Sequence, residues 1–189
     1  MTKNSLASKI LLLSSVLLIV FLGGWFYKFN SFNTKSMQPT IQLEINSPDF
    51  EDWDFLPVKF SCEGGDEFPT IIINNLPPQT QALAIRVQDP DAPIGVFVHL
   101  LAIIPSASNQ IDQQVLQKAI LGINNFGKLW WWGPCPPRWD KPHHYFFEIW
   151  ALKQIPNLQT GFDKKEFQNM LKNTPILAHW QIVGLFERK

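Results

Sequence analysis

The sequence lacks an excess of charge of either sign, because 16 lysines and arginines balance 16 aspartates and glutamates among its 189 residues. Without a basic surplus there is no bulk attraction to a polyanion, which excludes nucleic-acid binding as the main function. Charged residues are few, at 17%, whereas 46% of the chain is hydrophobic and 13% is aromatic. This composition excludes a disordered chain, and the length suits one globular domain.

Cysteine is also scarce, since Cys62 and Cys135 are the only two in the sequence. The sequence therefore has none of the close cysteine and histidine spacings that define zinc motifs. With His143 and an aspartate, Cys135 has the residue types of a thiol nucleophile. The alternative, which we favour if the body of the protein lies outside the cytoplasm, is a Cys62–Cys135 disulfide.

Apolar stretches are short except near the N-terminus, where residues 10–27 read ILLLSSVLLIVFLGGWFY without a charge. A helix of this length rises about 27 Å, close to the thickness of the hydrocarbon core of a bilayer. A cleaved signal peptide would need a shorter run and a small-residue cleavage site, and a lipoprotein would need a cysteine soon after the run. A buried core helix is a third alternative, against which the basic flanks argue. We therefore predict an uncleaved transmembrane signal anchor over residues 10–27.

Lysines flank this run on both sides and predict its orientation. The two lysines before the run, together with the amino terminus, carry one more charge than the two that follow it. Positive charge favours the cytoplasmic side of a membrane, so residues 1–9 are expected in the cytoplasm. The globular domain is then expected outside it, in the periplasm. Residues 28–40 have the composition of a loop and would tether the domain of residues 41–189 to this single-pass anchor.

The body of the chain has the pattern of strands more than of helices, because its apolar stretches are separated by turn residues. Strands are predicted at residues 41–46, 58–60, 70–73, 82–87, 96–104 and 145–152. Asp163 followed by Glu166 predicts the capped start of a helix. Thr174-Pro175 can start a second helix, and residues 112–121 can form a third. The body is therefore predicted to be mainly β, with two or three short helices.

Three polar clusters hold residue types that are costly to place by chance. They are Asp89-Pro90-Asp91-Ala92-Pro93 followed by His99, Gly133-Pro134-Cys135-Pro136-Pro137, and His143-His144-Tyr145. Prolines stiffen the first segment and hold its carboxylates at a fixed angle, while Gly133 allows close approach of a ligand. Imidazoles beside carboxylates can be held as hydrogen-bond donors, and a Gly-Pro loop exposes backbone N–H groups. Together the clusters indicate a small anion-binding site, here called the socket, for which phosphate or carboxylate is the expected ligand.

Each cluster also has an interpretation without such a ligand. The first can be a surface turn, His99 a hydrogen-bonded core histidine, and Trp130-Trp131-Trp132 core and rim packing. Two histidines and two aspartates could alternatively ligate a metal, although their spacing matches no zinc motif. The residues alone leave these alternatives open.

Further short motifs accompany the three clusters along the chain. They are Ser47-Pro48-Asp49-Phe50, Leu56-Pro57, Phe60-Ser61-Cys62-Glu63-Gly64, Leu76-Pro77, Ile104-Pro105, Gly122-Ile123-Asn124-Asn125-Phe126-Gly127 and Ala151-Leu152. In this order, from about residue 41 to residue 187, the motifs resemble those of the phosphatidylethanolamine-binding protein family, which includes the Raf kinase inhibitor proteins. The sequence is most similar to the bacterial branch of that family. DPDAP, then a histidine, then GPxPP, then HxY is a specific combination.

The resemblance implies a mainly antiparallel β-sandwich with an anion pocket at one edge of its core. By that resemblance the pocket is lined by Asp89, Asp91, Pro93, His99, Gly133, Pro134, His143 and Tyr145. Members of the family bind phosphate groups of phospholipid heads or nucleotides, and some inhibit kinases or serine proteases. No catalytic activity is common to them, so the resemblance implies neither an enzyme nor a cofactor.

Three features depart from the bacterial pattern of the family. Leu100 follows the pocket histidine where tryptophan is usual. His144 stands where arginine is common, which removes a cation that is independent of pH. Trp130-Trp131-Trp132 replaces a tyrosine-rich approach to the second cluster, with Trp132 in a place often held by glycine. These changes leave the socket residues intact and alter the rim around them.

The sequence supports three candidate functions. The first is a membrane-tethered regulatory domain that binds a phosphate-type anion, such as a phospholipid head, through His99 and His143. The second is a protein-interaction module that inhibits a protease or kinase, with the pocket or its tryptophan-rich rim receiving a loop of the partner. The third is a hydrolase that uses Cys135 or a His–Asp pair. A disulfide at Cys135 would remove the thiol version of the third.

Overall fold

The computed structural model describes residues 44–189. The segments predicted as the cytoplasmic N-terminus (1–9), the signal anchor (10–27) and the tether (28–40) lie outside the described residues and stay predictions. Among residues 44–189, no helix has both the length and the apolar character needed to span a bilayer. These residues share one hydrophobic core, with a smaller second core beside it.

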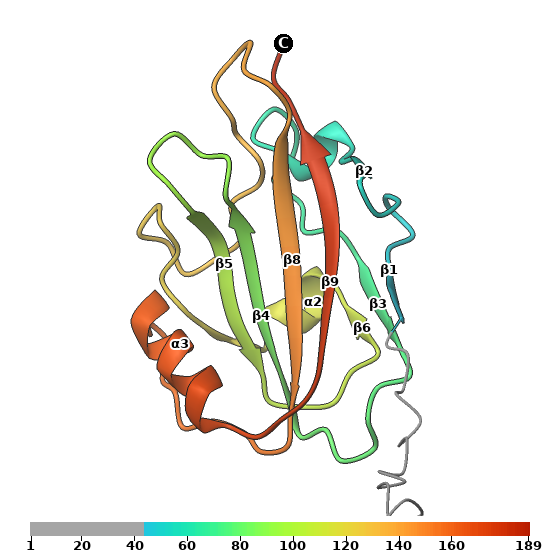
Figure 1. Cartoon of the computed structure of the whole chain (residues 1–189), viewed down its shortest axis with the longest axis vertical. Helices are drawn as coiled ribbons and strands as arrows, with labels where there is room; N and C mark the ends of the chain where they lie inside the picture. The colour runs from blue at the N-terminus through green and yellow to red at the C-terminus, as the bar shows by residue number, and fades with distance from the viewer. Residues whose placement is uncertain (1–43) are drawn as a thin grey trace, which may run out of the picture. The chain divides into compact units, whose positions relative to one another are not determined.

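The body contains two β-sheets, which Figure 1 shows. The larger sheet has six strands, in the order β2 (Asp54–Phe55), β9 (Ile176–Phe186), β8 (His143–Leu152), β4 (Ala82–Asp89), β5 (Phe97–Ile104) and β7 (Ile120–Leu121). The smaller sheet has three, in the order β1 (Glu44–Asn46), β3 (Ile71–Asn74) and β6 (Gln110–Ile111). Neighbouring strands are antiparallel, apart from the parallel pair β2 and β9. The prediction of a mainly antiparallel β fold is therefore confirmed.

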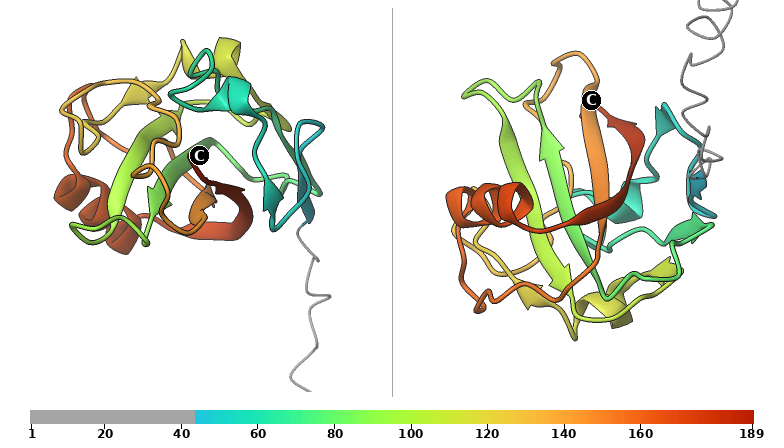
Figure 2. Two further views of the ribbon diagram at one scale, coloured as in Figure 1. Left: turned by 90° about the horizontal axis from the view of Figure 1, so that it is seen from above. Right: turned by 60° about the horizontal axis from the view of Figure 1, so that its bottom comes forward.

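Apolar side chains cover both faces of the larger sheet, because alternate residues of a strand point to opposite sides. Leu83 and Ile85 of β4 pack into the main core, which also contains side chains of the smaller sheet. Ala82 and Ala84 pack into the second core, which is closed by helix α3 (Lys164–Asn173). Figure 2 shows α3 and the smaller sheet on opposite sides of the larger sheet. Burial on both faces explains the nearly continuous apolar run of β4.

Helix α3 begins where the sequence predicts it. The Asp163 side chain accepts a hydrogen bond from the Glu166 backbone N–H at 2.8 Å, and the Glu166 carboxylate accepts one from the Asp163 N–H at 2.8 Å. This capping box satisfies two backbone donors that the first turn of a helix cannot pair internally. The predicted helix start at Asp163 is therefore confirmed.

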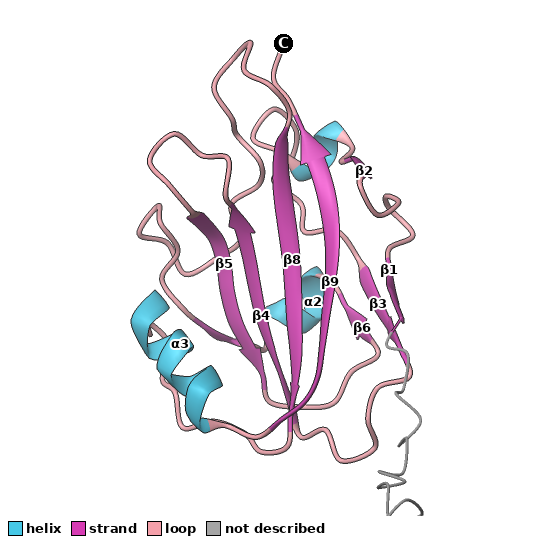
Figure 3. Cartoon of the chain, in the orientation of Figure 1, coloured by secondary structure: helices cyan, strands magenta, loops and turns pink. Residues whose placement is uncertain are grey.

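Two other local predictions need correction. Residues 58–60 form no strand but the short 3-10 helix η1 (Val58–Phe60), because the Phe60 N–H donates to the Pro57 carbonyl at 3.0 Å and bends the segment. Helix α2 (Gln113–Leu116) is shorter than the predicted 112–121, since residues 120–121 leave it to pair with β5 as β7. Figure 3 shows how little of the body is helical.

The helix predicted from Thr174-Pro175 is wrong, because the chain continues there as the 11-residue strand β9. Thr174 has φ −105° and ψ 132°, the extended conformation that a following proline favours. From Ala178 to Ile182, buried and exposed residues alternate, as they do on a strand. Pairing with β8 along the whole strand outweighs the weak helical signal of the proline.

Candidate anion-binding pocket

A cavity of about 350 Å³ lies at the end of the larger sheet where β4 ends and β8 begins. Five of the predicted pocket residues line it, namely Asp89, Pro93, His99, His143 and Tyr145. The other three, Asp91, Gly133 and Pro134, lie within two residues of a lining residue and do not line the cavity themselves. The wall is completed by residues that the sequence analysis did not assign to the pocket, namely Ala92, Ile94, Phe97, Phe126, Cys135, Pro136, Pro137 and Arg188.

Antiparallel pairing brings the first and third polar clusters together. Strand β4 pairs with β8 as far as Gln88 and Phe146, so the end of β4 meets the start of β8. Nδ1 of His143 lies 2.7 Å from Oδ2 of Asp89, and both side chains are buried. The other oxygen of Asp89 accepts a hydrogen bond from the Asp91 N–H at 2.8 Å. Both oxygens of Asp89 thus have partners within the chain, and the carboxylate fixes the orientation of His143.

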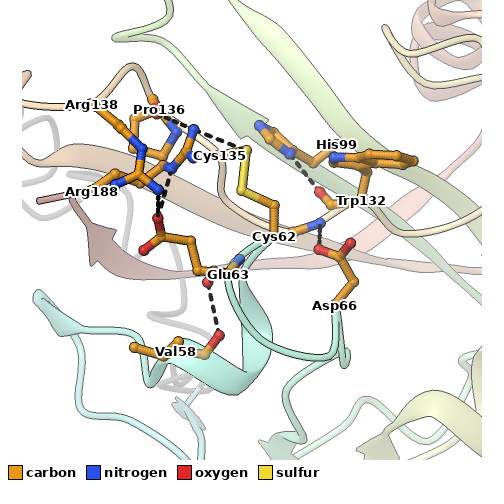
Figure 4. The surroundings of a disulfide bond; sticks show 12 residues. Val58, Cys62, Glu63, Asp66, His99, Trp132, Cys135, Pro136, Arg138 and Arg188 are labelled. Carbon is orange, nitrogen blue, oxygen red and sulfur yellow. Dashed lines mark hydrogen bonds and ion pairs between the residues drawn. A yellow bond between two sulfur atoms is a disulfide. The ribbon is translucent and has the colours of Figure 1, made fainter.

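A β-bulge sets the position of His99. Two successive residues of β4 face Leu100 and Val98, so His99 is the extra residue of β5 between them. Its Nδ1 lies 2.6 Å from the carbonyl oxygen of Trp132 (Figure 4). Since a carbonyl only accepts, Nδ1 carries the hydrogen, and Nε2 is the nitrogen left for a ligand. Burial lowers the pKa of His99, so the ring is neutral at pH 7 and Nε2 is an acceptor.

Tyr145 contributes a buried hydroxyl that has no hydrogen-bond partner within residues 44–189. The residue is 0% exposed and lines the cavity, with its ring 5.3 Å from that of His99. Burial, with the nearby charges of Asp89 and Asp91, raises the pKa of Tyr145, so the hydroxyl stays protonated and can donate. A buried hydroxyl without a partner costs about 1–3 kcal/mol, which a ligand in the cavity would recover.

Asp91 connects the first and third clusters from outside the cavity. Its Oδ2 accepts hydrogen bonds from the backbone N–H (3.0 Å) and from Nδ1 (2.7 Å) of His144, and its Oδ1 lies 2.8 Å from Nζ of Lys141. Burial opposes ionisation of Asp91, but these hydrogen bonds outweigh it and hold the pKa of the carboxyl well below its usual range. Asp91 therefore holds Lys141, before β8, and His144, near the start of β8. Between them, Nε2 of His143 lies 3.5 Å from Oδ2 of Asp140.

Gly133 is required by the packing of the chain on itself. A Cβ at this position would lie 2.2 Å from the carbonyl oxygen of Phe60 and 2.6 Å from Oδ1 of Asp66. The Gly133 N–H donates to the same Asp66 oxygen at 3.0 Å. Because glycine has no side chain, the 60–66 segment can approach the Gly133 backbone closely. The sequence predicts such an approach by a ligand, and the structure shows that it is made by the chain itself.

Cys62 and Cys135 form a disulfide between these same two segments, with their Cα atoms 5.4 Å apart (Figure 4). Neither cysteine of the sequence is free. Cys135 therefore has no thiol, and its interpretation as a nucleophile is wrong. Since Cys135 lines the cavity, the disulfide forms part of the pocket wall.

Replacing Asp89 by asparagine should lower the free energy of unfolding by about 1–3 kcal/mol, because the buried charge-assisted bond to His143 is lost. Urea unfolding of the variant and the parent chain measures this difference. Asp140→Asn is the matched control, since the Asp140 side chain is 40% exposed and lies farther from His143. The control should change stability much less than Asp89→Asn does. Equal losses in the two variants would contradict the positioning role of Asp89.

Comparison with known proteins agrees with this geometry. A family model described as phosphatidylethanolamine-binding protein matches residues 46–187. The chain belongs to this family. The matched residues include all three polar clusters and run from β1 to the end of β9.

Relatives within the phosphatidylethanolamine-binding proteins come from archaea and bacteria. UPF0098 protein PH1269 of Pyrococcus horikoshii is 35% identical over 157 residues, which are 79% of this chain and 78% of that protein. The crystal structure of YbcL of Escherichia coli, described as a new member of the mammalian PEBP family, superposes with a TM-score of 0.70 at 28% identity. That comparison covers 78% of this chain and 99% of YbcL. LppC of Mycobacterium tuberculosis, whose name describes it as a lipoprotein, is 36% identical over 124 residues, 63% of this chain and 61% of LppC.

The structure shows where the tryptophan run and His144, which depart from the bacterial pattern, lie relative to the pocket. Trp131 is buried in the main core, and its Nε1–H donates to the Glu67 carbonyl at 3.0 Å. The Trp132 ring lies 4.8 Å from that of Phe126, which lines the cavity. His144 binds Asp91, as described above, in place of the usual arginine. Trp131 thus belongs to the core, while Trp132 packs against the lining residue Phe126.

Proposed function

We propose that this member of the family binds a phosphate-type anionic group, such as a phospholipid head, and acts as a regulatory binding protein without catalytic activity or cofactor. The observation that carries the proposal is the hydroxyl of Tyr145, which is buried, lines the cavity and has no partner among the described residues. The imidazoles of His99 and His143 line the same cavity. A phosphate oxygen is a strong acceptor for the Tyr145 hydroxyl, and for the imidazole of His99 once its Nε2 also carries a hydrogen.

The remainder of the cavity suits an organic group attached to the phosphate. Its volume of about 350 Å³ would hold on the order of ten waters, more than a phosphate ion fills. Part of the cavity wall is apolar and is formed by Ile94, Phe97 and Phe126. A head group that combines an anion with carbon atoms would therefore use both the donors and the apolar wall.

The proposal includes a location outside the cytoplasm, in the periplasm, on a single-pass anchor. Disulfides persist in oxidising compartments, and the Cys62–Cys135 bond supports such a location. The uncharged run of residues 10–27 supports a membrane anchor. The name of LppC supports an association of this branch with membranes.

Imidazole NMR signals of the full-length chain test the binding, because the sequence contains four histidines. Phosphate and phosphoethanolamine, added separately, should shift His99 and His143 saturably. His179 is the internal reference, since it stacks on Trp150 at the second core. His143→Ala should abolish the shift at His99. Unshifted His99 and His143 up to millimolar ligand would overturn the proposal.

Tyr145→Phe is a milder test of the same site. It removes only the unpartnered hydroxyl and leaves the packing of the ring unchanged. The affinity for phosphoethanolamine should fall by about tenfold, the loss expected for one hydrogen bond to a charged group, while stability is kept. Unaltered affinity would show that the hydroxyl meets no ligand.

Inhibition of a protease or kinase is the second candidate function, and exposed apolar side chains favour it. Ile94 and Trp139 are 82% and 81% exposed, and Ile94 also lines the cavity. Trp131, which the sequence analysis placed in a partner-binding rim, is buried and offers no such surface. Loss of protease or kinase binding in Trp139→Ala, with retention in His143→Ala, would favour this function.

A further inference from the structure

Arg188 brings a permanent positive charge to the wall of the pocket. The other titratable lining residues are Asp89, His99, His143 and Tyr145, and none of these has a positive charge independent of pH. Arg188 lies beyond the end of β9, where its carbonyl accepts a hydrogen bond from the Trp139 N–H at 2.9 Å. The C-terminal segment is thereby held beside the loop that precedes β8.

The guanidinium of Arg188 has two different surroundings (Figure 4). On one side, Nε lies 3.1 Å from Oε1 of Glu63. On the other side, Nη1 lies 3.6 Å from Sγ of Cys135 and 3.4 Å from the carbonyl oxygen of Pro136, which are both lining residues. Contacts of this length to neutral acceptors are weak. An anionic oxygen in the cavity would be a stronger acceptor for Nη1, and the planar guanidinium suits phosphate.

Glu63 is shared between two arginines. Its Oε1 lies 3.1 Å from Nη2 of Arg138 as well as 3.1 Å from Nε of Arg188. The Arg138 side chain is 56% exposed and is not part of the cavity lining, whereas that of Arg188 is 22% exposed. The two arginines therefore bind the same carboxylate, and of the two Arg188 alone borders the pocket.

We propose that Arg188 is the residue that selects an anion for this pocket, and that Glu63 competes with the anion for its guanidinium. This inference rests on the proposed function and assigns its specificity to a residue outside the three polar clusters. The carboxylate of Glu63 offsets the charge of Arg188 from the side away from the cavity. Removal of the Glu63 charge should therefore strengthen anion binding, and removal of the Arg188 charge should weaken it.

Isothermal titration of phosphoethanolamine into the full-length chain at pH 7 tests these opposite signs. Arg188→Gln should weaken binding by about tenfold or more, which is the effect of losing a hydrogen bond from a charged donor. Arg138→Gln is the matched control, because it also loses a bond to Glu63. Since Arg138 does not border the pocket, the affinity of this variant should stay within about twofold of that of the parent chain. Glu63→Gln keeps the shape of the side chain and should strengthen binding several-fold. High salt should reduce the difference between the parent chain and Arg188→Gln.

The outcomes separate this inference from a structural role and from the proposed function. Unchanged imidazole signals of His99 and His143 in each variant show that the pocket is intact. If the Arg188–Glu63 pair served only structure, Glu63→Gln would weaken binding together with Arg188→Gln. That result, or an Arg188→Gln affinity within twofold of the parent chain, overturns the inference and leaves the proposed function standing. Absence of binding by the parent chain overturns both.

Discussion

Lowering the pH from 8 to about 6 should strengthen the binding of an anion of constant charge by up to about tenfold per pH unit. Nδ1 of His99 already donates to Trp132, so an anion at Nε2 requires the doubly protonated ring. Burial lowers the pKa of His99 below 6.5, although Asp89 and Asp66 favour the charged ring. The proton must therefore be taken up with the anion, and affinity rises as pH falls towards the lowered pKa of His99, below which it levels off.

Sulfate is a suitable probe because its own charge does not change over this range. Titration calorimetry in two buffers that differ in ionisation enthalpy would measure the protons taken up per sulfate bound. His99→Asn should reduce this uptake by one proton, whereas His179→Asn, at the second core, should leave it unchanged. Equal sulfate affinity at pH 6 and pH 8, with no proton uptake, would show that the anion does not meet Nε2 of His99.

Loss of the Cys62–Cys135 disulfide should lower the free energy of unfolding by about 4 kcal/mol. The bond joins residues 73 apart in the sequence, and in the chain-entropy model a loop of this size restricts the unfolded chain by about that amount. Unfolding in urea with and without a thiol reductant would measure the effect. A double variant, Cys62→Ala with Cys135→Ala, should match the reduced chain and be insensitive to reductant. Equal stability of oxidised and reduced protein would contradict the prediction.

The same disulfide gives this prediction a functional consequence. Cys135 lines the cavity, and its sulfur lies 3.6 Å from Nη1 of Arg188. Reduction removes the covalent link between the 133–137 segment and the 60–66 segment and should weaken phosphoethanolamine binding in the same samples. Binding that survives reduction unchanged would show that Gly133 and its hydrogen bond to Asp66 hold the pocket wall without the disulfide.

Local sequence signals predict those elements whose stability depends on near neighbours. The capping box of Asp163 and Glu166 is complete within four residues, so the start of α3 could be read directly. Long β-branched and apolar runs likewise predict β4, β5 and β8. The local sequence does not predict the start of strand β9, because Pro175 suits the first position of a helix as well as an extended chain. Pairing with β8 favours the strand over the helix. Pairing with a strand distant in the sequence is only weakly predicted by the local sequence.

The candidate site divides in a similar way. Motif order and family resemblance brought Asp89, His99, His143 and Tyr145 to one expected pocket, and these side chains line one cavity. The sequence does not reveal which partner each of these side chains binds in the folded chain. The register of β4 and β5 creates the bulge at His99, and the contact with Trp132 decides which nitrogen remains for a ligand.

The sequence by itself determined a mainly β domain, a capped α3 and the identity of the residues that could bind an anion. Only the tertiary structure decided that Gly133 accommodates Phe60, that Cys135 has no thiol, and that Arg188 borders the pocket. The physical reason is the range of the interactions involved. Caps and strand patterns act over a few residues, whereas Arg188 reaches Glu63 across 125 residues of chain, through contacts that exist only after the sheets have packed.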